Sequence, residues 1–150
     1  MYPLQHLSLG IVFSLIILFI FPQIGLIGFL IIILSTILID IDHYIYYIYR
    51  KKDWSLKNAY NWSSNTGKKF FLFSKKQKDK FYTGFYFLHG VEIILVCLLL
   101  SIISKYFLFI SLGFTFHLLL DIYFIGRYHN RVDRVSVIYD FLKFKKLKPL

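Results

Sequence analysis

No aspartate, glutamate, lysine or arginine occurs between Met1 and Ile39. A soluble domain of 150 residues could not hide so long an uncharged apolar stretch in one core. Cysteine is nearly absent as well, since Cys97 is the only one, and this excludes a disulfide scaffold. Disorder is excluded because 57% of the chain is hydrophobic, with many aromatic and β-branched residues. These features predict a small integral membrane protein with a single domain, residues 1–150.

The first apolar stretch is too long for one membrane crossing. As a single helix, Met1–Ile39 would measure about 58 Å, against a hydrocarbon core of about 30 Å. Pro22 provides the break, because it lacks a backbone donor and disfavours helical geometry at the preceding residue. We therefore predict an all-α bundle of four transmembrane helices in two hairpins, with a central loop at 50–81 and a tail at 127–150. The predicted helices are approximately Leu4–Phe21, Ile24–Tyr49, Tyr82–Ser104 and Tyr106–Gly126.

Positive charge is confined to two segments of the chain. Of the 18 basic residues, ten lie in Arg50–Lys80, seven lie in Arg127–Lys148, and Lys105 is the remaining one. The positive-inside rule then places the central loop, the tail and both termini in the cytoplasm of a multi-pass protein of the inner (cytoplasmic) membrane. The tail segment Val132–Lys146 has the pattern of an amphipathic helix on anionic lipid, although a basic tail that only fixes topology fits equally well. Aromatic residues between the lysines of Lys68–Tyr86 indicate a membrane surface rather than nucleic acid.

Ionisable side chains inside the predicted spans occur in pairs. They are costly in hydrocarbon and usually face the interior of a bundle. Two pairs are spaced i,i+3 and one is spaced i,i+4, so each pair shares a helix face. Counted from the cytoplasmic ends, all three pairs lie about 9–16 Å deep, and a further histidine lies near the start of the first helix. The residues are Asp40 and His43, His89 and Glu92, His117 and Asp121, and His6.

A common depth for these groups is not required by helix formation or by membrane insertion. Histidine nitrogen with carboxylate oxygen suits Zn²⁺ above all, and also Mn²⁺ or Fe²⁺, as one or two ions. We therefore predict metal ligands among His6, Asp40, His43, His89, His117 and Asp121. The competing interpretation is a hydrogen-bonded histidine–carboxylate network that holds the helices together.

Three motifs, Ile39-Asp40-Ile41-Asp42-His43, His89-Gly90-Val91-Glu92 and His117-Leu118-Leu119-Leu120-Asp121, resemble those of the small YdjM-like inner-membrane proteins, described as metal-dependent hydrolases. The resemblance covers the whole chain in order and implies that His6, Asp40, Asp42, His43, His89, His117 and Asp121 match the family's histidines and aspartates. Ile39 stands where the family has proline. Gly84 and Phe85 stand where it has His-Arg. These departures indicate a divergent member with an altered ligand set.

The predicted function is a membrane-embedded metal-dependent hydrolase that cleaves a phosphoester or related bond of a lipid at the cytoplasmic leaflet. A carboxylate that does not bind metal, Asp42 or Glu92, is the candidate general base. Arg127, Arg131 and Arg134 are candidates to bind phosphate, and His129 beside them has no assigned role. The alternatives are a non-enzymatic metal-binding or structural membrane protein, an ion-conducting bundle, and a di-iron oxidase. The apolar outer halves of the helices count against a channel.

Overall fold

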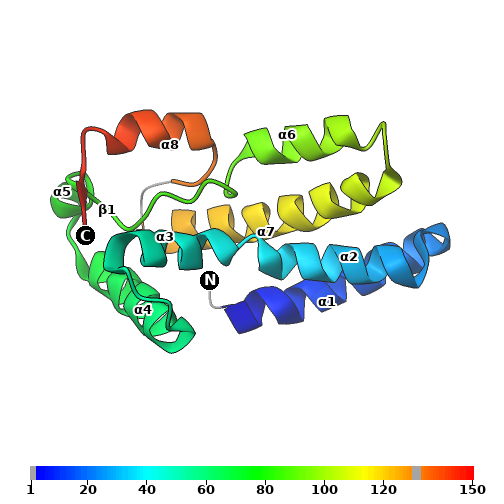
Figure 1. The fold of residues 1–150 in the computed structure, drawn as a ribbon, viewed down its shortest axis with the longest axis horizontal. Coiled ribbons are helices and arrows are strands. Elements are labelled where there is room, and N and C mark those ends of the chain that lie inside the picture. The colour runs from blue at the N-terminus through cyan, green and yellow to red at the C-terminus, as the bar shows by residue number, and fades with distance from the viewer. Residues whose placement is uncertain (1–2, 130–132) are drawn as a thin grey trace.

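The structure is a computed structural model, and it describes residues 3–129 and 133–150 of the chain. Its first two helices form a hairpin. Helix α1 (Pro3–Ile20) is followed by a single 3-10 turn, η1 (Pro22–Ile24), and then by α2 (Gly25–Leu38). The break predicted at Pro22 is confirmed, and Gly25 completes the reversal with a φ of 63°, a value that favours glycine. Figure 1 shows α1 and α2 side by side along the long axis of the molecule.

The second predicted helix is interrupted. Instead of running unbroken over 24–49, it divides into α2 and α3 (Ile41–Lys51), with a turn at Ile39 and Asp40. At this turn the Asp40 N–H donates to the carbonyl of Ile37 at 3.1 Å rather than to that of Thr36. The Thr36 carbonyl is thereby released from the helix ladder and needs another donor.

The third predicted helix begins much later than expected. The prediction of Tyr82–Ser104 was wrong at its start, since α6 covers only Val91–Leu100 and an irregular segment precedes it. Gly90 adopts an extended conformation, and a Cβ there would lie 2.8 Å from the backbone nitrogen of Val137. The chain after α7 (Lys105–His129) also pairs here, because the Val91 N–H donates to the carbonyl of Val135 at 2.9 Å. This contact takes the place of the first turns of a longer helix.

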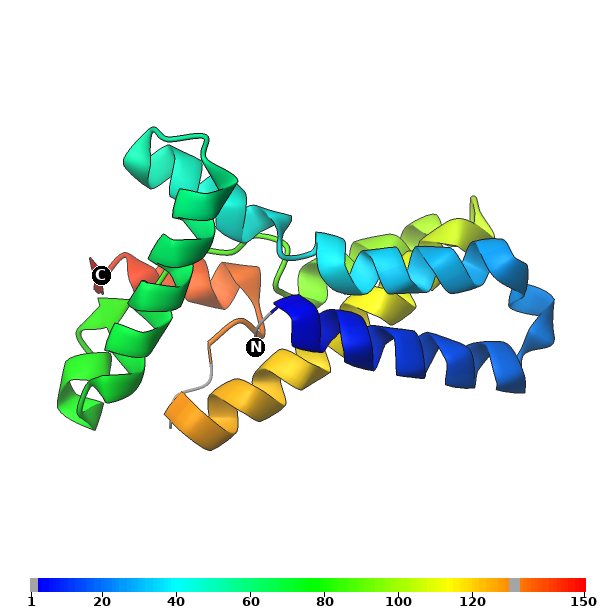
Figure 2. The same cartoon turned by 90° about the horizontal axis from the view of Figure 1, so that it is seen from below.

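The central segment is helical rather than a loop. It contains α4 (Leu56–Leu72) and the single turn α5 (Lys75–Lys78). A helix, α8 (Val137–Phe144), also forms in the tail, within the predicted amphipathic segment. The two-residue strands β1 (Phe81–Tyr82) and β2 (Lys148–Pro149) pair in parallel and tie the tail to the segment before α6. Seen from below, α4 runs across the direction of α1, α2 and α7 at one end of the bundle (Figure 2).

Close packing of α2 against α7 forms the centre of the bundle. A Cβ on Gly113 of α7 would lie 2.6 Å from the Ser35 Cβ and 2.7 Å from the Ile32 carbonyl oxygen, so only glycine permits this approach. Large apolar side chains face outward along the bundle, among them Phe19, Ile102 and Ile103. Two helical stretches, Pro22–Lys51 and Lys105–Arg127, are long and apolar enough to cross a membrane, while Leu4–Ile20 and Val91–Leu100 are shorter apolar helices.

Candidate metal centre

The six predicted ligands come together at one place, where α2 gives way to α3. They reach it from α1, the α2–α3 turn, α3, the segment before α6, and α7. Within this cluster, three overlapping groups each have ligand atoms within 4.8 Å of one another. The groups are His6, Asp40 and His117; Asp40, His43 and His89; and His89, His117 and Asp121. These buried histidine and aspartate side chains could therefore hold a metal ion.

His89 and His117 face each other at the centre of the cluster. Both are fully buried, and their Nε2 atoms lie 3.2 Å apart. The Nδ1 atom of His117 lies 2.8 Å from the Thr36 carbonyl, which can only accept, so this nitrogen carries the hydrogen. The Nδ1 atom of His89 lies 3.0 Å from the Asp42 carboxylate and donates in the same way. In the neutral imidazoles, both Nε2 lone pairs then face each other at 3.2 Å, and either an added proton or a metal ion shared by the two nitrogens removes this repulsion.

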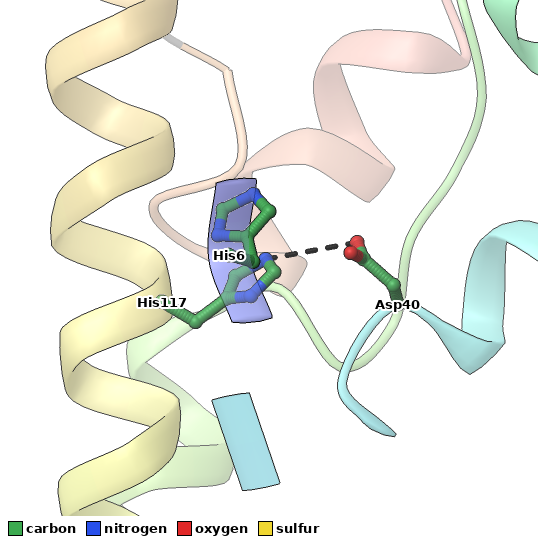
Figure 3. A group of neighbouring side chains, drawn as sticks. All are labelled: His6, Asp40 and His117. Atoms are coloured by element: carbon green, nitrogen blue, oxygen red, sulfur yellow. Dashed lines mark ion pairs between the residues drawn. The ribbon is translucent and has the colours of Figure 1, made fainter. Parts of the chain in front are cut away.

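Two carboxylates add oxygen atoms to this pair of nitrogens. The Asp40 Oδ1 atom lies 3.4 Å from the His89 Nε2 atom and 3.6 Å from the His117 Nε2 atom. The Asp121 Oδ2 atom lies 3.8 Å from each of these nitrogens. Ligands about 2.0–2.1 Å from one tetrahedral zinc ion are about 3.3–3.4 Å apart, so these distances suit a shared divalent ion after small adjustments. Figure 3 shows the His6 and His117 rings together, with the Asp40 carboxylate facing the His117 ring from across a gap.

His6 and His43 flank the central pair in different ways. The His6 ring stacks on His117 with centroids 3.9 Å apart, and its Nε2 atom lies 3.3 Å from the Asp121 Oδ1 atom. The His43 ring stacks on Tyr86 at 3.8 Å. Among the described residues, neither His6 Nδ1 nor His43 Nε2 has a hydrogen-bond partner, although both are buried atoms. Buried nitrogens without a hydrogen-bond partner are available either to bind a cation or to accept a proton.

Asp42 supports His89 from behind. Its Oδ2 atom accepts from the His89 ring and from the Leu88 N–H at 2.9 Å. Asp40 meets the other nitrogen of the same imidazole, so the interrupted helix places both carboxylates on one histidine. A carboxylate in this position fixes the tautomer of a metal-binding histidine. The geometry favours that role for Asp42 over the predicted role as general base.

Glu92 does not share a helix face with His89, because His89 precedes α6. Its carboxylate instead accepts from the Ser136 hydroxyl and from the backbone N–H groups of Val137 and Ile138 at 2.9 and 3.2 Å. Glu92 therefore caps the N-terminus of α8 and ties it to α6. The prediction that His89 and Glu92 form a pair on one helix was wrong, and the described contacts of Glu92 give it no place beside the cluster.

Of the three arginines predicted to bind phosphate, one approaches the cluster. The Arg134 Nη1 atom lies 3.2 Å from the Asp121 Oδ2 atom, and its guanidinium lies 4.5 Å from the centre of the Tyr86 ring. Arg134 has a φ of 67°, and its N–H donates to the Asp140 carboxylate, whose pKa is raised by burial. Arg127 is exposed at the end of α7, while Arg131 and the side chain of His129 lie outside the described residues.

A cavity of about 470 Å³ lies beside the cluster. Its lining includes Asp40, His43 and Arg134. Helix α4 also contributes to the lining, with residues that include Tyr60 and Lys68. The cluster is therefore buried on one side and accessible through Asp40 and His43, whose side chains are 18% and 22% exposed.

The anchor of α4 is a set of hydrogen bonds at its N-terminus. Asp53 accepts from the Tyr47 hydroxyl, from the Asn58 amide at 2.9 Å and from the Ser55 N–H at 2.9 Å. The Tyr47 hydroxyl and these further donors lower the pKa of the Asp53 carboxyl. The Ser55 side chain also caps the helix by accepting from the Asn58 N–H.

Sequence reasoning missed three contributors to this site: the Thr36 carbonyl, the Tyr86 ring and helix α4. The only available signal was for α4, where Asp53 and Ser55 precede a run without proline and could have suggested a capped helix. Comparison with protein-family models, with curated proteins and with solved structures finds no match for this chain, so the resemblance to YdjM-like proteins stays a prediction.

Proposed function

We propose that the protein is a membrane-embedded hydrolase that uses a divalent metal ion, zinc above all, to cleave a phosphoester or related bond of a lipid at the cytoplasmic leaflet. One observation supports this most directly. The free Nε2 positions of His89 and His117 converge with Asp40 next to a cavity that Arg134 also lines. A ligand set of this kind beside an open cavity suits catalysis better than a closed structural metal site.

Each side chain has a distinct task in this proposal. His89, His117 and Asp40 would hold the ion, and Asp121, 3.8 Å from both histidine nitrogens, would add its negative charge beside it. Three ligands leave a position for a water molecule, whose pKa the ion would lower when bound while it polarises the phosphoryl oxygen. Asp42 and the Thr36 carbonyl keep the ring hydrogens of the two histidines on Nδ1. His43 lines the cavity with an unpaired Nε2, so we assign it the proton-accepting role that the sequence suggested for Asp42 or Glu92. Arg134 would bind the anionic phosphate.

The membrane arrangement is part of the proposal. We propose four spans with both termini in the cytoplasm, which puts the cluster and the basic residues of α4, α5 and the tail on the cytoplasmic side. Single cysteines at Gln23 and Ser64, in a Cys97→Ser background, should be labelled from opposite sides of the membrane by an impermeant reagent. Labelling from the same side would refute this topology and the position of the cluster within it.

The activity is tested with the full chain reconstituted in vesicles. Phosphatidic acid and other phospholipids are supplied, and release of phosphate or headgroup is measured with and without a chelator. We expect chelator-sensitive release that is lost in Asp40→Asn and His117→Ala and retained in Lys57→Gln, an exposed position on α4 that does not line the cavity.

A second function is favoured by the burial of the cluster. His6, His89, His117 and Asp121 are each at most 1% exposed, as is common for a structural metal site without turnover. Full metal occupancy with no release from any lipid would support this non-enzymatic metal-binding protein. A di-iron oxidase is disfavoured, because the described contacts of Glu92 leave the cluster with only aspartates as acidic ligands.

A further inference from the structure

The lining of the cavity is chemically mixed. Its polar residues include Asp40, His43 and Arg134 together with Ser63, Ser64 and Lys68 of α4. Its apolar residues include Leu56, Ala59 and Tyr60 of α4 and Phe124 and Ile125 of α7. A ligand that fills such a cavity must itself be amphipathic.

The residues of α4 that line the cavity follow one helical face. Leu56, Tyr60, Ser63 and Gly67 are spaced by three or four residues, so they point in the same direction. Leu56 and Tyr60 remain 70% and 54% exposed, although they belong to the apolar face of an amphipathic helix. The face that such a helix normally buries in a core here borders the open cavity, which leaves this apolar surface available to a ligand.

Gly67 borders open space in the wall of the cavity. A glycine inside a helix costs about 0.5–1 kcal/mol relative to alanine, and it is usually explained by close packing or by a positive φ. Neither applies to Gly67. Among the described residues nothing lies within 4 Å of a Cβ built there, and its φ is not in the left-handed region. The space beside it belongs to the cavity, and to a second hollow of about 460 Å³ that Lys68, Phe71 and Leu72 also line.

The charges of this region select an anion. The stretch 56–78, which comprises α4 and α5, contains six lysines and no acidic residue. Lys68 lines the cavity from α4, and Arg134 lines it from the chain before α8. Both basic side chains share this lining with Asp40 and His43, so a phosphate group that enters the cavity meets positive charge beside the cluster.

We propose that the cleft between α4 and the end of α7 is a binding site for one anionic phospholipid, with its phosphate between Lys68 and Arg134 and an acyl chain along Leu56, Tyr60 and Phe124. This proposal rests on the proposed function only in taking this cavity as the functional site. It identifies the ligand as the phosphate group of a lipid and not as free phosphate.

The test uses the full chain in detergent and native mass spectrometry to measure binding. The probe is the phosphonate analogue of dioleoyl phosphatidic acid, which cannot be hydrolysed at the headgroup, so binding is measured independently of turnover. We expect a single lipid bound per chain, and at least about tenfold weaker binding in Gly67→Phe, whose ring would fill the cleft. Gly126→Phe is the matched control, because a Cβ at Gly126 also meets nothing within 4 Å and this residue does not line the cavity.

A second pair of variants tests the headgroup contact. Lys68→Gln should weaken binding several-fold, whereas its exposed neighbour Lys69→Gln, outside the lining, should leave binding unchanged. Equal binding by Gly67→Phe and the wild type would overturn the proposal. So would equal binding of dioleoyl phosphatidylcholine, or binding of glycerol 3-phosphate as tight as that of the lipid. Lipid binding without turnover in the activity assay would support the lipid-binding site and refute the proposed hydrolase activity.

Discussion

The two ends of the helical bundle differ in where they place polar and apolar side chains. At the end that holds the α1–α2 and α6–α7 turns, Phe19, Ile102 and Ile103 are more than 80% exposed. At the other end, His89 and His117 are fully buried and Asp121 is 1% exposed. At the first end the apolar side chains lie on the outer surface, which suits a hydrocarbon environment. At the second end the ionisable side chains lie in the interior.

This difference shows that the two ends depend on different surroundings. The end with the α1–α2 and α6–α7 turns is held by apolar helix packing, as where a Cβ on Gly28 would lie 2.9 Å from the Phe109 ring. The cluster end brings together four histidines and three aspartates whose hydrogen bonds leave several nitrogens unpaired. Such a group is stable in a membrane protein only when the charges are balanced, and a bound cation would balance them.

The largest effect is expected from His117→Ala. This change removes one central nitrogen, leaves the Thr36 carbonyl without its donor, and leaves Asp40 and Asp121 with fewer neutralising contacts. We expect a loss of about 3–5 kcal/mol in the free energy of unfolding, together with loss of bound metal. Denaturation in detergent and elemental analysis measure the two effects. The control is Leu119→Ala, 60% exposed on the same helix, and equal stability and metal content in the two variants would contradict the metal centre.

Asp42→Asn is expected to act on the metal without unfolding the protein. An asparagine can still accept from the Leu88 N–H, but it holds the His89 ring less firmly than a carboxylate does. We expect metal affinity to fall about 10–100-fold, as is typical for a group that orients a ligand. A chelator competition titration measures this change, with Asp79→Asn, an exposed position, as the control. An unchanged affinity would mean that His89 does not bind metal.

Gly113→Val tests the close packing of α2 against α7. The valine side chain would collide with Ser35 and with the Ile32 carbonyl, so α2 and α7 must move apart. We expect a loss of about 1–3 kcal/mol, a typical cost of overpacking, measured as a lower midpoint of denaturation. Gly126→Val shares the same change in helix propensity but meets nothing within 4 Å, so it isolates the steric effect. Similar stability of the two variants would argue against this helix contact.

The smallest effect is expected outside the bundle, from Asp53→Asn. The Tyr47 hydroxyl and the N-terminus of α4 lower the pKa of Asp53, so the charged carboxylate stabilises the fold. This contribution is fully present above the pKa of an unfolded aspartate, about 3.9, and is lost as the pH falls through the lower folded pKa. The difference in melting temperature between the variant and the wild type should therefore shrink below about pH 4. A difference independent of pH would mean that the charge is not involved.

The sequence was sufficient to predict the helical class, the break at Pro22 and the convergence of the histidines and aspartates. These follow from hydropathy, from proline chemistry and from depth counted along a helix, and each needs only local information. The convergence is found even where the predicted local structure was wrong, since His89 reaches the cluster from an irregular segment rather than from a helix. The position of each residue along its predicted helix therefore predicted the cluster better than the shared helix faces did.

The remaining features depend on contacts between distant segments. The turn at Ile39 and Asp40 contains neither proline nor glycine, and it is coupled to the bond between Thr36 and His117, 81 residues apart. The late start of α6 follows from its contact with Val135 and from the cap that Glu92 gives to α8. A backbone carbonyl that orients a histidine has no side-chain signature, so no pattern in the sequence could have revealed it.

In the four-span arrangement proposed above, helix α6 has a consequence for the surrounding bilayer. Its ten residues measure about 15 Å, only half of the hydrocarbon thickness that the longer helices match. A lipid layer in contact with α6 has to become thinner or else cover the polar segment before Gly90, and thinning costs fractions of a kcal/mol per ångström. We expect the bilayer to be locally thinner next to α6 than around the rest of the protein. This hydrophobic mismatch would draw lipid headgroups toward the depth of the histidines and make the protein sensitive to the acyl-chain length of its host membrane.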